Sequence, residues 1–450
     1  MTKACAHTSY LLGSVAYLML RFAPICFLGL WFTQPVGATP MTLKDTLRYA
    51  LDHSPTLDTA KQQELAGELE MKNARAALLP SLDATTTNGL LHTSPLSGTD
   101  PWGSSLNVTL TENLYDNGVT LTAYRVAQVN RQIAVLGQLQ ARWKLCLTVV
   151  QQFYKYSLAA KLSAVKDQQL GLYQKQFRFV QDQYKQGMKP RKDFLRFKSQ
   201  AQRSEIDTRQ ARIDVERALV DVRNTIGVPP TEAQVDGLAF EMFEPEISPT
   251  DVPQVPPPVA NVIDYRVADL TRSLAPYDVQ LAKRNYYPRI SLGVGANYGN
   301  NNYIHSGVPF STTQSNGWNV LLTLSYNFWD WGILSRKVEI AERNRDIAEN
   351  TFRQAALDAR SEVNQLMLDL AQIKENYKLV RDLLSSEEES FESTKRDYRE
   401  GKIQPYDFIL SLNDLLDARV RFFTSQYGLA EAQARYQYYY GNLYEKLSLE

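Results

Sequence analysis

This chain carries nearly the same unit twice, so any fold it adopts has to accommodate two similar halves. The segments QYKQGMKPRKDFL (183–195) and DYREGKIQPYDFI (397–409) share a tyrosine, a glycine and an Asp-Phe pair, 214 residues apart. This offset holds without a gap from Asn113 to Gly227. Upstream the offset becomes 208, because Pro80 falls on Pro288. The second copy therefore carries six additional residues in its strand region.

The duplication divides the chain into a signal peptide (1–38), a first repeat (39–227), a linker or equatorial segment (228–262) and a second repeat (263–450). Proline and acidic residues mark the linker. The first repeat is predicted to contain a helix, strands at about 80–91 and 104–115, a long helix at 118–186 and a return helix at 190–227. The second is predicted to contain a helix, strands at about 288–299 and 317–329, a long helix at 332–400 and a return helix at 405–442.

The beginning of the chain indicates export. Lys3 precedes an apolar run from about Tyr10 to Phe32, and Val36-Gly37-Ala38 supplies the small residues of a cleavage site, so we expect cleavage after Ala38. A retained membrane helix is the alternative, since Arg21 interrupts a run that is longer than usual. Cys26 follows a residue that does not suit lipid modification, so no lipid anchor is expected.

Composition and motifs exclude several classes of function. Only Cys146 lies outside the signal, so no intramolecular disulfide is expected. A formal net charge of zero gives no reason to expect a nucleic-acid partner. The four histidines lack metal-ligand spacing, and neither a phosphate-binding glycine loop nor a nucleophile elbow is present. The sequence therefore predicts no enzyme, no catalytic residue, no metal and no cofactor.

Alternating patterns predict two strands in each copy. Residues 291–298 and 319–328 place apolar side chains on one face and small polar ones on the other, and residues 106–114 repeat this pattern. Strands of about ten residues suit an outer membrane. The alternation equally fits a half-buried hairpin in a soluble sheet. Aromatic residues favour the membrane, because they cluster at both strand ends: Tyr115, Phe328, Trp329 and Trp331 at one, Tyr298, Tyr303, Phe310 and Trp318 at the other.

Four strands per chain cannot close a barrel. The backbone groups of a sheet in lipid must all be paired, and a four-stranded sheet has two open edges. The smallest barrels have about eight strands, which two chains supply, while three chains supply twelve and leave a lumen. Small polar residues on the inward face favour the lumen, and hence a trimer.

The longest helical patterns run from Val119 to Gln186 and from Ile333 to Glu400, and neither contains proline. Each helix is expected to be about 100 Å long. Apolar residues recur with a 3.5-residue period in the second copy, which is typical of lengthwise coiled-coil packing. Gly187 and Gly401 end these patterns, and Pro190 and Pro405 lie a few residues after them. The repeated motif therefore predicts the tip of a helical hairpin.

Each copy also begins with a helical pattern. In the first copy it covers Leu43 to Leu79, and Pro80 ends it. In the second copy Pro276 lies within the corresponding pattern, so that helix is expected to begin late or to kink there.

At this point the chain resembles the TolC-type outer-membrane efflux protein family. The resemblance is carried by TLKDTLRYALDHSPTLDTAK, the run ending LLPSL, the Asn-Leu-Tyr-Asp-Asn-Gly strand exit, the Tyr-x-x-Gly tip and the break TIGVPP. It implies an α+β membrane protein in which three protomers form a twelve-stranded barrel, continuous with a helical barrel that crosses the periplasm from the cell outer membrane. It further implies an exit duct for tripartite efflux or type I secretion, served by a periplasmic adaptor and an inner-membrane RND, ABC or MFS transporter.

The resemblance also assigns roles to residues at the tips. Asp407 resembles the acidic residue that forms a ring at the narrow periplasmic aperture. Tyr398 and Asp193 resemble a closed-state latch between the hairpins, and Gly187 and Gly401 resemble adaptor-docking positions. Both carboxylates also fit ordinary helix N-terminal acids, and Tyr398 also fits a hydrophobic stripe.

Two positions depart from the family pattern. Leu410 stands where a second acidic ring residue is expected, and Ile403 replaces the latching arginine, for which Lys402 or Arg399 are candidate substitutes. The competing function is a trimeric coiled-coil surface adhesin or stalk with a barrel anchor, although such a stalk needs neither two copies nor return helices. The cargo is either small toxic molecules or an exported polypeptide.

Overall fold

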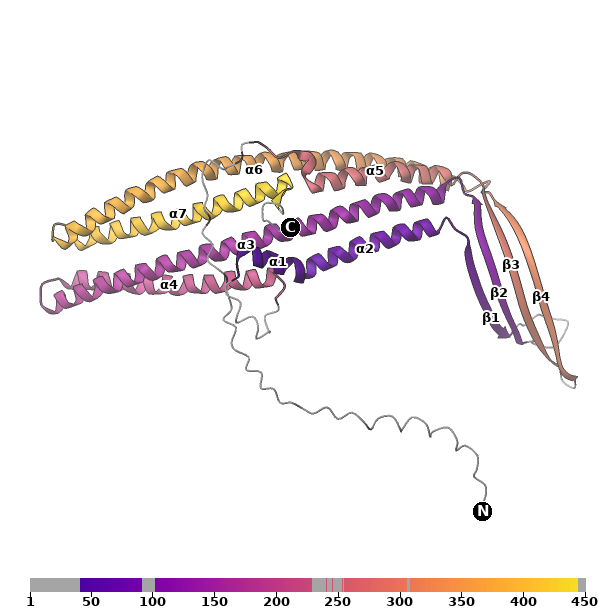
Figure 1. Ribbon diagram of the computed structural model, residues 1–450, viewed down its shortest axis with the longest axis horizontal. Helices are drawn as coiled ribbons and strands as arrows, with labels where there is room; N and C mark the ends of the chain where they lie inside the picture. The colour runs from indigo at the N-terminus through magenta and orange to yellow at the C-terminus, as the bar shows by residue number, and fades with distance from the viewer. Residues whose placement is uncertain are drawn as a thin grey trace, which may run out of the picture. The chain divides into compact units, whose positions relative to one another are not determined.

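The computed structural model of the chain describes residues 41–90, 102–228, 240, 245, 253, 255–305 and 308–443. The predicted signal peptide and most of the predicted linker lie outside these residues. The described part is mostly helical, with one four-stranded sheet (Figure 1).

The elements follow one another in two similar series. The first series is α1 (Leu43–His53), α2 (Pro55–Ala76), β1 (Ser81–Leu90), β2 (Trp102–Tyr115), α3 (Val119–Lys185) and α4 (Arg191–Thr225). After a short 3-10 helix, η3 (Val259–Asn261), the second series is α5 (Ile263–Arg284), β3 (Arg289–His305), β4 (Val308–Ser325), α6 (Ile333–Arg399) and α7 (Pro405–Tyr440).

The two series keep the sequence offsets at the level of structure. α2 and α5 each contain 22 residues and lie 208 residues apart at both ends, while α3 and α6 each contain 67 residues and lie 214 apart. The hairpins share one register as well. Leu82 pairs with Leu110 in the first hairpin, and the matching residues Ile290 and Leu324 pair in the second.

The sheet is antiparallel in the order β1-β2-β3-β4, so β1 and β4 are its edges. Its apolar face is continuous across the strands, because these residues stand directly opposite one another and remain exposed: Leu82, Leu110, Val294 and Val320. The other face is small and polar. There Asn297 lies opposite Gly317, where an added Cβ would come within 2.8 Å of the asparagine Oδ1.

The fourth strand differs from its predicted bounds. It begins at Val308 and ends at Ser325, whereas the alternating pattern predicts about 317–329. The reason lies in the pairing. β3 begins at Arg289, which pairs with Ser325, so the residues after Ser325 have no strand beside them.

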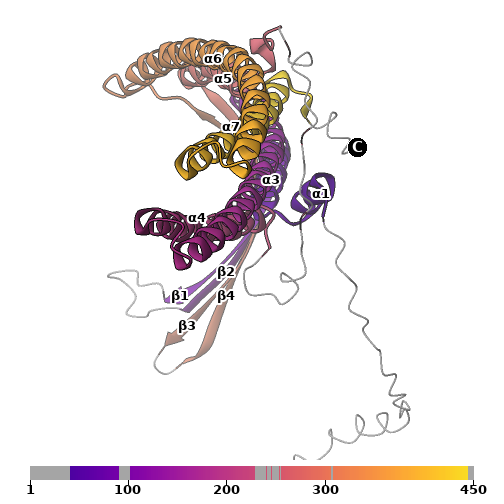
Figure 2. The same ribbon diagram turned by 90° about the vertical axis from the view of Figure 1, so that its left-hand side faces the viewer.

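The helices form a single layer of neighbours, as Figures 1 and 2 show. Near the strands, extensive packing joins α2 to α3, α3 to α5 and α5 to α6. Toward the tips it joins α4 to α3, α3 to α7 and α7 to α6. A layer of this kind has two lateral edges, with α2 and α4 on one side and α6 on the other.

Apolar clusters among the described residues hold the layer together along its length, and three of the four are large. One joins α1, α3 and α4 around Phe153 and Ile226, a second joins α6 and α7 around Leu370 and Leu429, and a third lies near the tips. The tip cluster draws on all four long helices, with Val180, Phe197, Phe391 and Leu412 among its members. Burial of about 25 cal/mol per Å² of apolar surface makes such clusters the main stabilising contribution.

Residues of the linker fasten to the helices where they are described. Phe240 is buried beside Phe153, with ring centroids 6.3 Å apart. Gln426 donates from Nε2 to the carbonyl of Pro245 at 3.0 Å, and the Tyr436 hydroxyl donates to the carbonyl of Val255 at 2.9 Å. These contacts attach the segment between the copies to α3 and α7.

Two helix predictions need correction. The pattern from Leu43 to Leu79 is two helices, because Ser54 ends α1 and Pro55 opens α2 at a position where its missing N–H costs nothing. Of the two outcomes expected at Pro276, the late start is wrong, since α5 begins at Ile263 and continues through the proline, while the kink stays a prediction. Buried Ala275 and Val279 pack on either side of it and hold the helix in place.

Candidate functional site at the hairpin tips

Both hairpin tips are built by the same glycine motif. Gly187 has φ +74° and Gly401 has φ +76°, in the left-handed region that glycine adopts without strain. The Gly401 N–H donates to the Tyr398 carbonyl at 3.1 Å and the Lys402 N–H to the Asp397 carbonyl at 2.9 Å. This is a Schellman cap, and Gly187 repeats it. No heavy atom lies within 4 Å of a Cβ added at either glycine, so both tips are open to solvent.

A three-ring stack supports each tip. In the second hairpin Phe408 lies between Phe391, at 5.8 Å, and Tyr398, at 4.8 Å between ring centroids. In the first hairpin the matching rings of Phe177, Phe194 and Tyr184 are separated by 5.7 and 5.0 Å. The stack fixes the orientation of Tyr398 and half-buries its phenol. The sequence did not lead us to expect the stacks, although all three rings repeat at the 214-residue offset.

The structure brings the two predicted aspartates into one groove. Asp193 and Asp407 each lie in the first turn of a return helix, α4 and α7. A cavity of about 400 Å³ lies between them, and its other lining residues are Lys192, Arg196, Phe197, Gln404 and Tyr406. Carboxylates of both hairpins and two cations of the first hairpin therefore line a single space, together with the buried ring of Phe197.

One contact in this groove crosses between the hairpins directly. The Arg196 guanidinium of α4 lies over the Tyr406 ring of α7, with Cζ 4.9 Å from the ring centroid. Such a cation–π contact contributes about 0.5–1 kcal/mol at an exposed site. Sequence reasoning missed Arg196, although it lies three residues after Asp193 and hence on the same helix face.

The predicted latch residues are linked through the effect of the Asp193 charge on Tyr398. Burial raises the pKa of the Tyr398 phenol, and the negative charge of Asp193 raises that pKa further. Among the described hydrogen bonds none joins the two side chains, so the Tyr398 phenol and the Asp193 carboxylate are near neighbours without a direct bond in this structure.

Ile403, at the position of the family arginine, and its neighbours Lys402 and Arg399 differ in their surroundings. Ile403 packs against the tip cluster, and the ammonium group of Lys402 forms an ion pair with Glu400 at 2.5 Å. Arg399 and Leu410 are exposed. A latching role for Lys402 or Arg399 stays a prediction, and Arg196 reaches across from the other hairpin.

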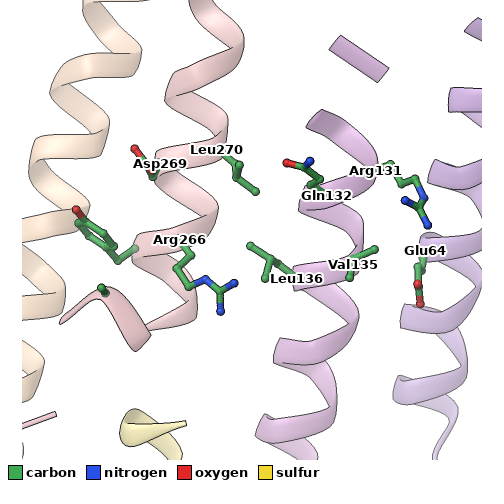
Figure 3. A pocket seen from close by; sticks show the side chains of 10 residues that line it. Glu64, Arg131, Gln132, Val135, Leu136, Arg266, Asp269 and Leu270 are labelled. Atoms are coloured by element: carbon green, nitrogen blue, oxygen red, sulfur yellow. The ribbon is translucent and has the colours of Figure 1, made fainter. Parts of the chain in front are cut away.

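A second, larger cavity lies where α3 and α5 meet, and Figure 3 shows its lining. It measures about 700 Å³, and the side chains of Leu136 and Leu270 contribute to its walls together with Arg131 and Arg266. Its residues include no nucleophile paired with a base. Sequence reasoning did not foresee this cavity, because it arises from packing between the two copies.

Two properties of the described residues bear on a metal site and on membrane-spanning helices. Within them, no cluster of three or more His, Cys, Asp or Glu side chains could hold a metal ion. Also within them, no helix has the length and apolar character of a membrane-crossing segment. The tip groove holds charged side chains, and its cation–π contact joins the two hairpins.

Known protein families include one that matches most of this chain. A family model described as outer membrane efflux protein matches residues 46–228 and 260–447. Among curated proteins, none matches the chain in sequence.

Solved structures match the fold along most of the chain. The outer membrane channel CmeC of Campylobacter jejuni has a TM-score of 0.78 at 15% identity, over 89% of this chain and 85% of that one. VceC of Vibrio cholerae has a TM-score of 0.72 at 15% identity, over 88% and 95%. The open state of the MtrE outer membrane channel of Neisseria gonorrhoeae has a TM-score of 0.70 at 18% identity, over 89% and 88%.

Proposed function

Because the chain belongs to the outer membrane efflux protein family, we propose that three copies of it form a passive exit duct that is gated at the hairpin tips. The resemblance drawn from the sequence is thereby confirmed, and the chain is an outer-membrane protein with a long periplasmic helical extension. The family consists of transport channels rather than enzymes, so the duct performs no catalytic step. The alternative of an adhesin or stalk finds no support in the family match.

The two open edges of the four-stranded sheet support the proposal of a trimer. Within the described residues, β1 and β4 each have one side without a partner strand, and the apolar face of the sheet is exposed. In a membrane such edges are tolerated only where they pair with another strand. Three copies supply twelve strands, which is wide enough to enclose a lumen lined by the small polar face.

The helical layer supports the same assembly. On α4, at one edge, Ile206, Ile213 and Val220 are exposed at seven-residue intervals, and on α6, at the other edge, Ile333, Ile340 and Ile347 follow the same spacing. Heptad spacing is typical of a seam that packs against another helix. Neighbouring copies that meet edge to edge would cover both seams.

We propose that Asp407 forms the ring that narrows the periplasmic aperture. It is exposed at the tip, in the first turn of α7, where three copies would place three carboxylates around one axis. A ring of carboxylates favours cations in a pore.

Planar-bilayer recording tests the ring. We expect Asp407→Ala to lower the preference for potassium over chloride, shown by a reversal potential closer to zero in a salt gradient. Glu392→Ala removes an exposed carboxylate of α6 away from the groove and should leave the reversal potential unchanged. Equal selectivity of the Asp407→Ala variant and the native channel would exclude the ring.

We further propose that Tyr398 and Asp193 help to keep the tips closed. Burial is the larger cause of the raised pKa of Tyr398, but the smaller effect of the Asp193 charge supports their proximity, and the ring stack leaves the phenol little freedom to move away. The double variant Tyr398→Phe, Asp193→Ala is expected to raise the single-channel conductance. A double variant that stays as closed as the native channel would remove these residues from the gate.

The tips are also the proposed docking site for a periplasmic adaptor, which would connect the duct to an inner-membrane RND, ABC or MFS transporter. The open space around Gly187 and Gly401 supports this proposal, since a partner backbone can approach a glycine closely. Energy and choice of cargo then belong to the transporter. The duct serves either tripartite efflux of small molecules or type I secretion of a polypeptide.

A further inference from the structure

The two hairpin tips share a fold but differ in charge. In the first tip, residues 182–198 contain six Lys or Arg and two Asp, which leaves a net charge of +4. In the second tip, the matching residues 396–412 contain three Lys or Arg and three Asp or Glu, so their charges cancel. Both tips lie at the end of the helices away from the strands (Figure 1). The duplicated motif therefore keeps its geometry in both copies, whereas its charge has diverged.

The excess charge gathers around the open turn at Gly187. Four cations lie within five residues of this glycine: Lys185, Lys189, Arg191 and Lys192. Met188 lies between them in the chain, and its side chain is 61% exposed. We propose that these cations and Met188, together the basic tip patch, dock an acidic protein segment that also offers an apolar contact to Met188. This inference rests on the proposed docking of a partner at the tips and adds the chemistry of that partner.

The cations of the patch are left without carboxylate partners. None of the four forms an ion pair with another residue that the structure describes. The second tip differs, since Lys395 pairs with Glu392 at 2.7 Å and Lys402 pairs with Glu400 at 2.5 Å. Like charges that are gathered on one turn repel one another. An acidic partner would replace this repulsion by attraction.

The start of α4 shows that these charges carry a cost. α4 begins at Arg191, and Lys192 follows in its first turn. The N-terminus of a helix carries a partial positive charge, so acidic side chains stabilise this turn and cations destabilise it. In α7 the matching positions hold Pro405 and Tyr406, which are uncharged at neutral pH. The first hairpin therefore bears two unfavourable cations that the second lacks, and an acidic partner would offset their cost.

Met188 supplies the apolar centre of the patch. Its backbone N–H donates to the Gln183 carbonyl at 2.8 Å as part of the helix cap, while its side chain remains exposed. Methionine adapts its shape to a partner and is enriched at protein interfaces. The matching residue of the second tip is Lys402. An apolar contact of this kind is therefore expected at the first tip and not at the second.

Assembly of three copies would leave the patch accessible. Lys185 is the last residue of α3 and Arg191 the first of α4, so the patch occupies the turn between these helices. The seam proposed on α4 runs along the helix through Ile206, Ile213 and Val220. Copies that meet along such seams would cover helix faces and not the turn.

Photo-cross-linking in cells tests the chemistry of the partner. The full-length channel carries the photoreactive residue p-benzoylphenylalanine in place of Met188, and the captured peptides are identified by mass spectrometry. We expect a peptide of another protein in which Asp and Glu outnumber Lys and Arg. The same photoreactive residue in place of Lys402 is the comparison, and it should capture no acidic peptide.

Charge reversal provides the matched variants. Lys189→Glu, Arg191→Glu should lower the yield of the cross-link at position 188 roughly tenfold, because attraction becomes repulsion. A glutamate at the first position of α4 is favoured by the helix dipole, so a weakened helix would not explain this loss. The control Lys144→Glu, Lys175→Glu reverses two exposed cations of α3 away from the tip, and its yield should stay within about twofold of the native yield.

An assay with purified protein measures the attraction directly. Fluorescein-labelled poly-L-glutamate is titrated into the channel in an uncharged detergent, and binding is followed by fluorescence anisotropy. Binding should weaken as salt is added, since salt screens exposed charges. It should also weaken roughly tenfold in the Lys189→Glu, Arg191→Glu variant and stay unchanged in the α3 control.

The outcomes distinguish this inference from the proposed docking. A captured partner peptide without an acidic excess, or an unchanged yield after charge reversal, would overturn the acidic partner while docking at the tips stands. Capture of a lipid, or of another copy of this chain, at position 188 would overturn it as well. If neither tip captured any other protein, the docking itself would be wrong.

Discussion

The left-handed glycines at the tips show how one residue type decides where a long helix stops. Gly187 and Gly401 take positive φ and close identical caps, while their surroundings are open. Conformation alone, rather than crowding, therefore requires glycine there. A residue with a Cβ in this conformation costs about 1–2 kcal/mol.

Replacement of Gly401 tests this argument. Gly401→Ala is expected to destabilise the hairpin by about 1 kcal/mol and to lower the apparent unfolding temperature followed by circular dichroism at 222 nm. Gly171 lies inside α3 and also has open space around it, so Gly171→Ala should raise that temperature, since alanine favours a helix interior by about 1 kcal/mol. Shifts of the same sign in both variants would contradict the conformational explanation.

The tip groove marks the limit of what the sequence could predict about single residues. Asp193 and Asp407 could be singled out because they repeat at a fixed offset and follow a cap. Arg196 carried no such signal, since its counterpart at the same offset, Leu410, is apolar. Its contact with Tyr406 depends on how two hairpins lie side by side, which no local pattern encodes.

At the scale of elements, α5 carries a cost that its counterpart α2 avoids. Pro276 lies inside α5 and cannot donate a backbone hydrogen bond, while the matching position in α2 is Glu68. A proline in a helix interior costs about 3 kcal/mol, which the packing of Ala275 and Val279 offsets.

Pro276→Ala should therefore stabilise α5, by up to about 3 kcal/mol, because it restores the missing hydrogen bond. The expected observation is slower amide hydrogen exchange in α5. Pro405→Ala is the control, since proline at the first position of α7 breaks no helical bond and its replacement should change exchange little. Unchanged exchange in α5 would mean that the helix has adapted fully to the proline.

Elements were predictable where local signals were strong. The two long helices lie within one residue of their predicted bounds, because no proline interrupts them and glycine ends them. The end of β4 was not predictable to the same degree. Alternation continues to Phe328, but a strand also needs a partner, and β3 offers none beyond Ser325. The break at Ser54 was visible in the sequence as Ser-Pro, a typical helix start.

At the scale of the whole molecule, the exposed heptad seams imply that stability depends on assembly. Ile213 occupies the middle of the α4 seam, and in a trimer each copy would bury it against a neighbour. A charge placed there would be buried without a partner, at a cost of several kcal/mol.

Ile213→Glu is accordingly expected to shift the protein toward monomers. A loss of only 1.4 kcal/mol lowers the association constant about tenfold, and the seam recurs in every copy. Light scattering coupled to size-exclusion chromatography in detergent measures the ratio of trimers to monomers. Arg212→Glu changes charge on the same helix about 100° around it from Ile213 and breaks an exposed ion pair with Asp167, so its trimers should persist. Equal dissociation of both variants would argue against the seam.

The longer second hairpin shows where such a protein is free to change. β3 and β4 continue their pairing to His305 and Val308, beyond the last residues that match the first hairpin, and the inserted residues fall within this extension. The ladder below them keeps its register, and the helices keep their lengths. Added residues at that end of the β3–β4 hairpin therefore leave the rest of the sheet and the helices unchanged. This end of the hairpin can diversify under selection independently of the rest of the protein.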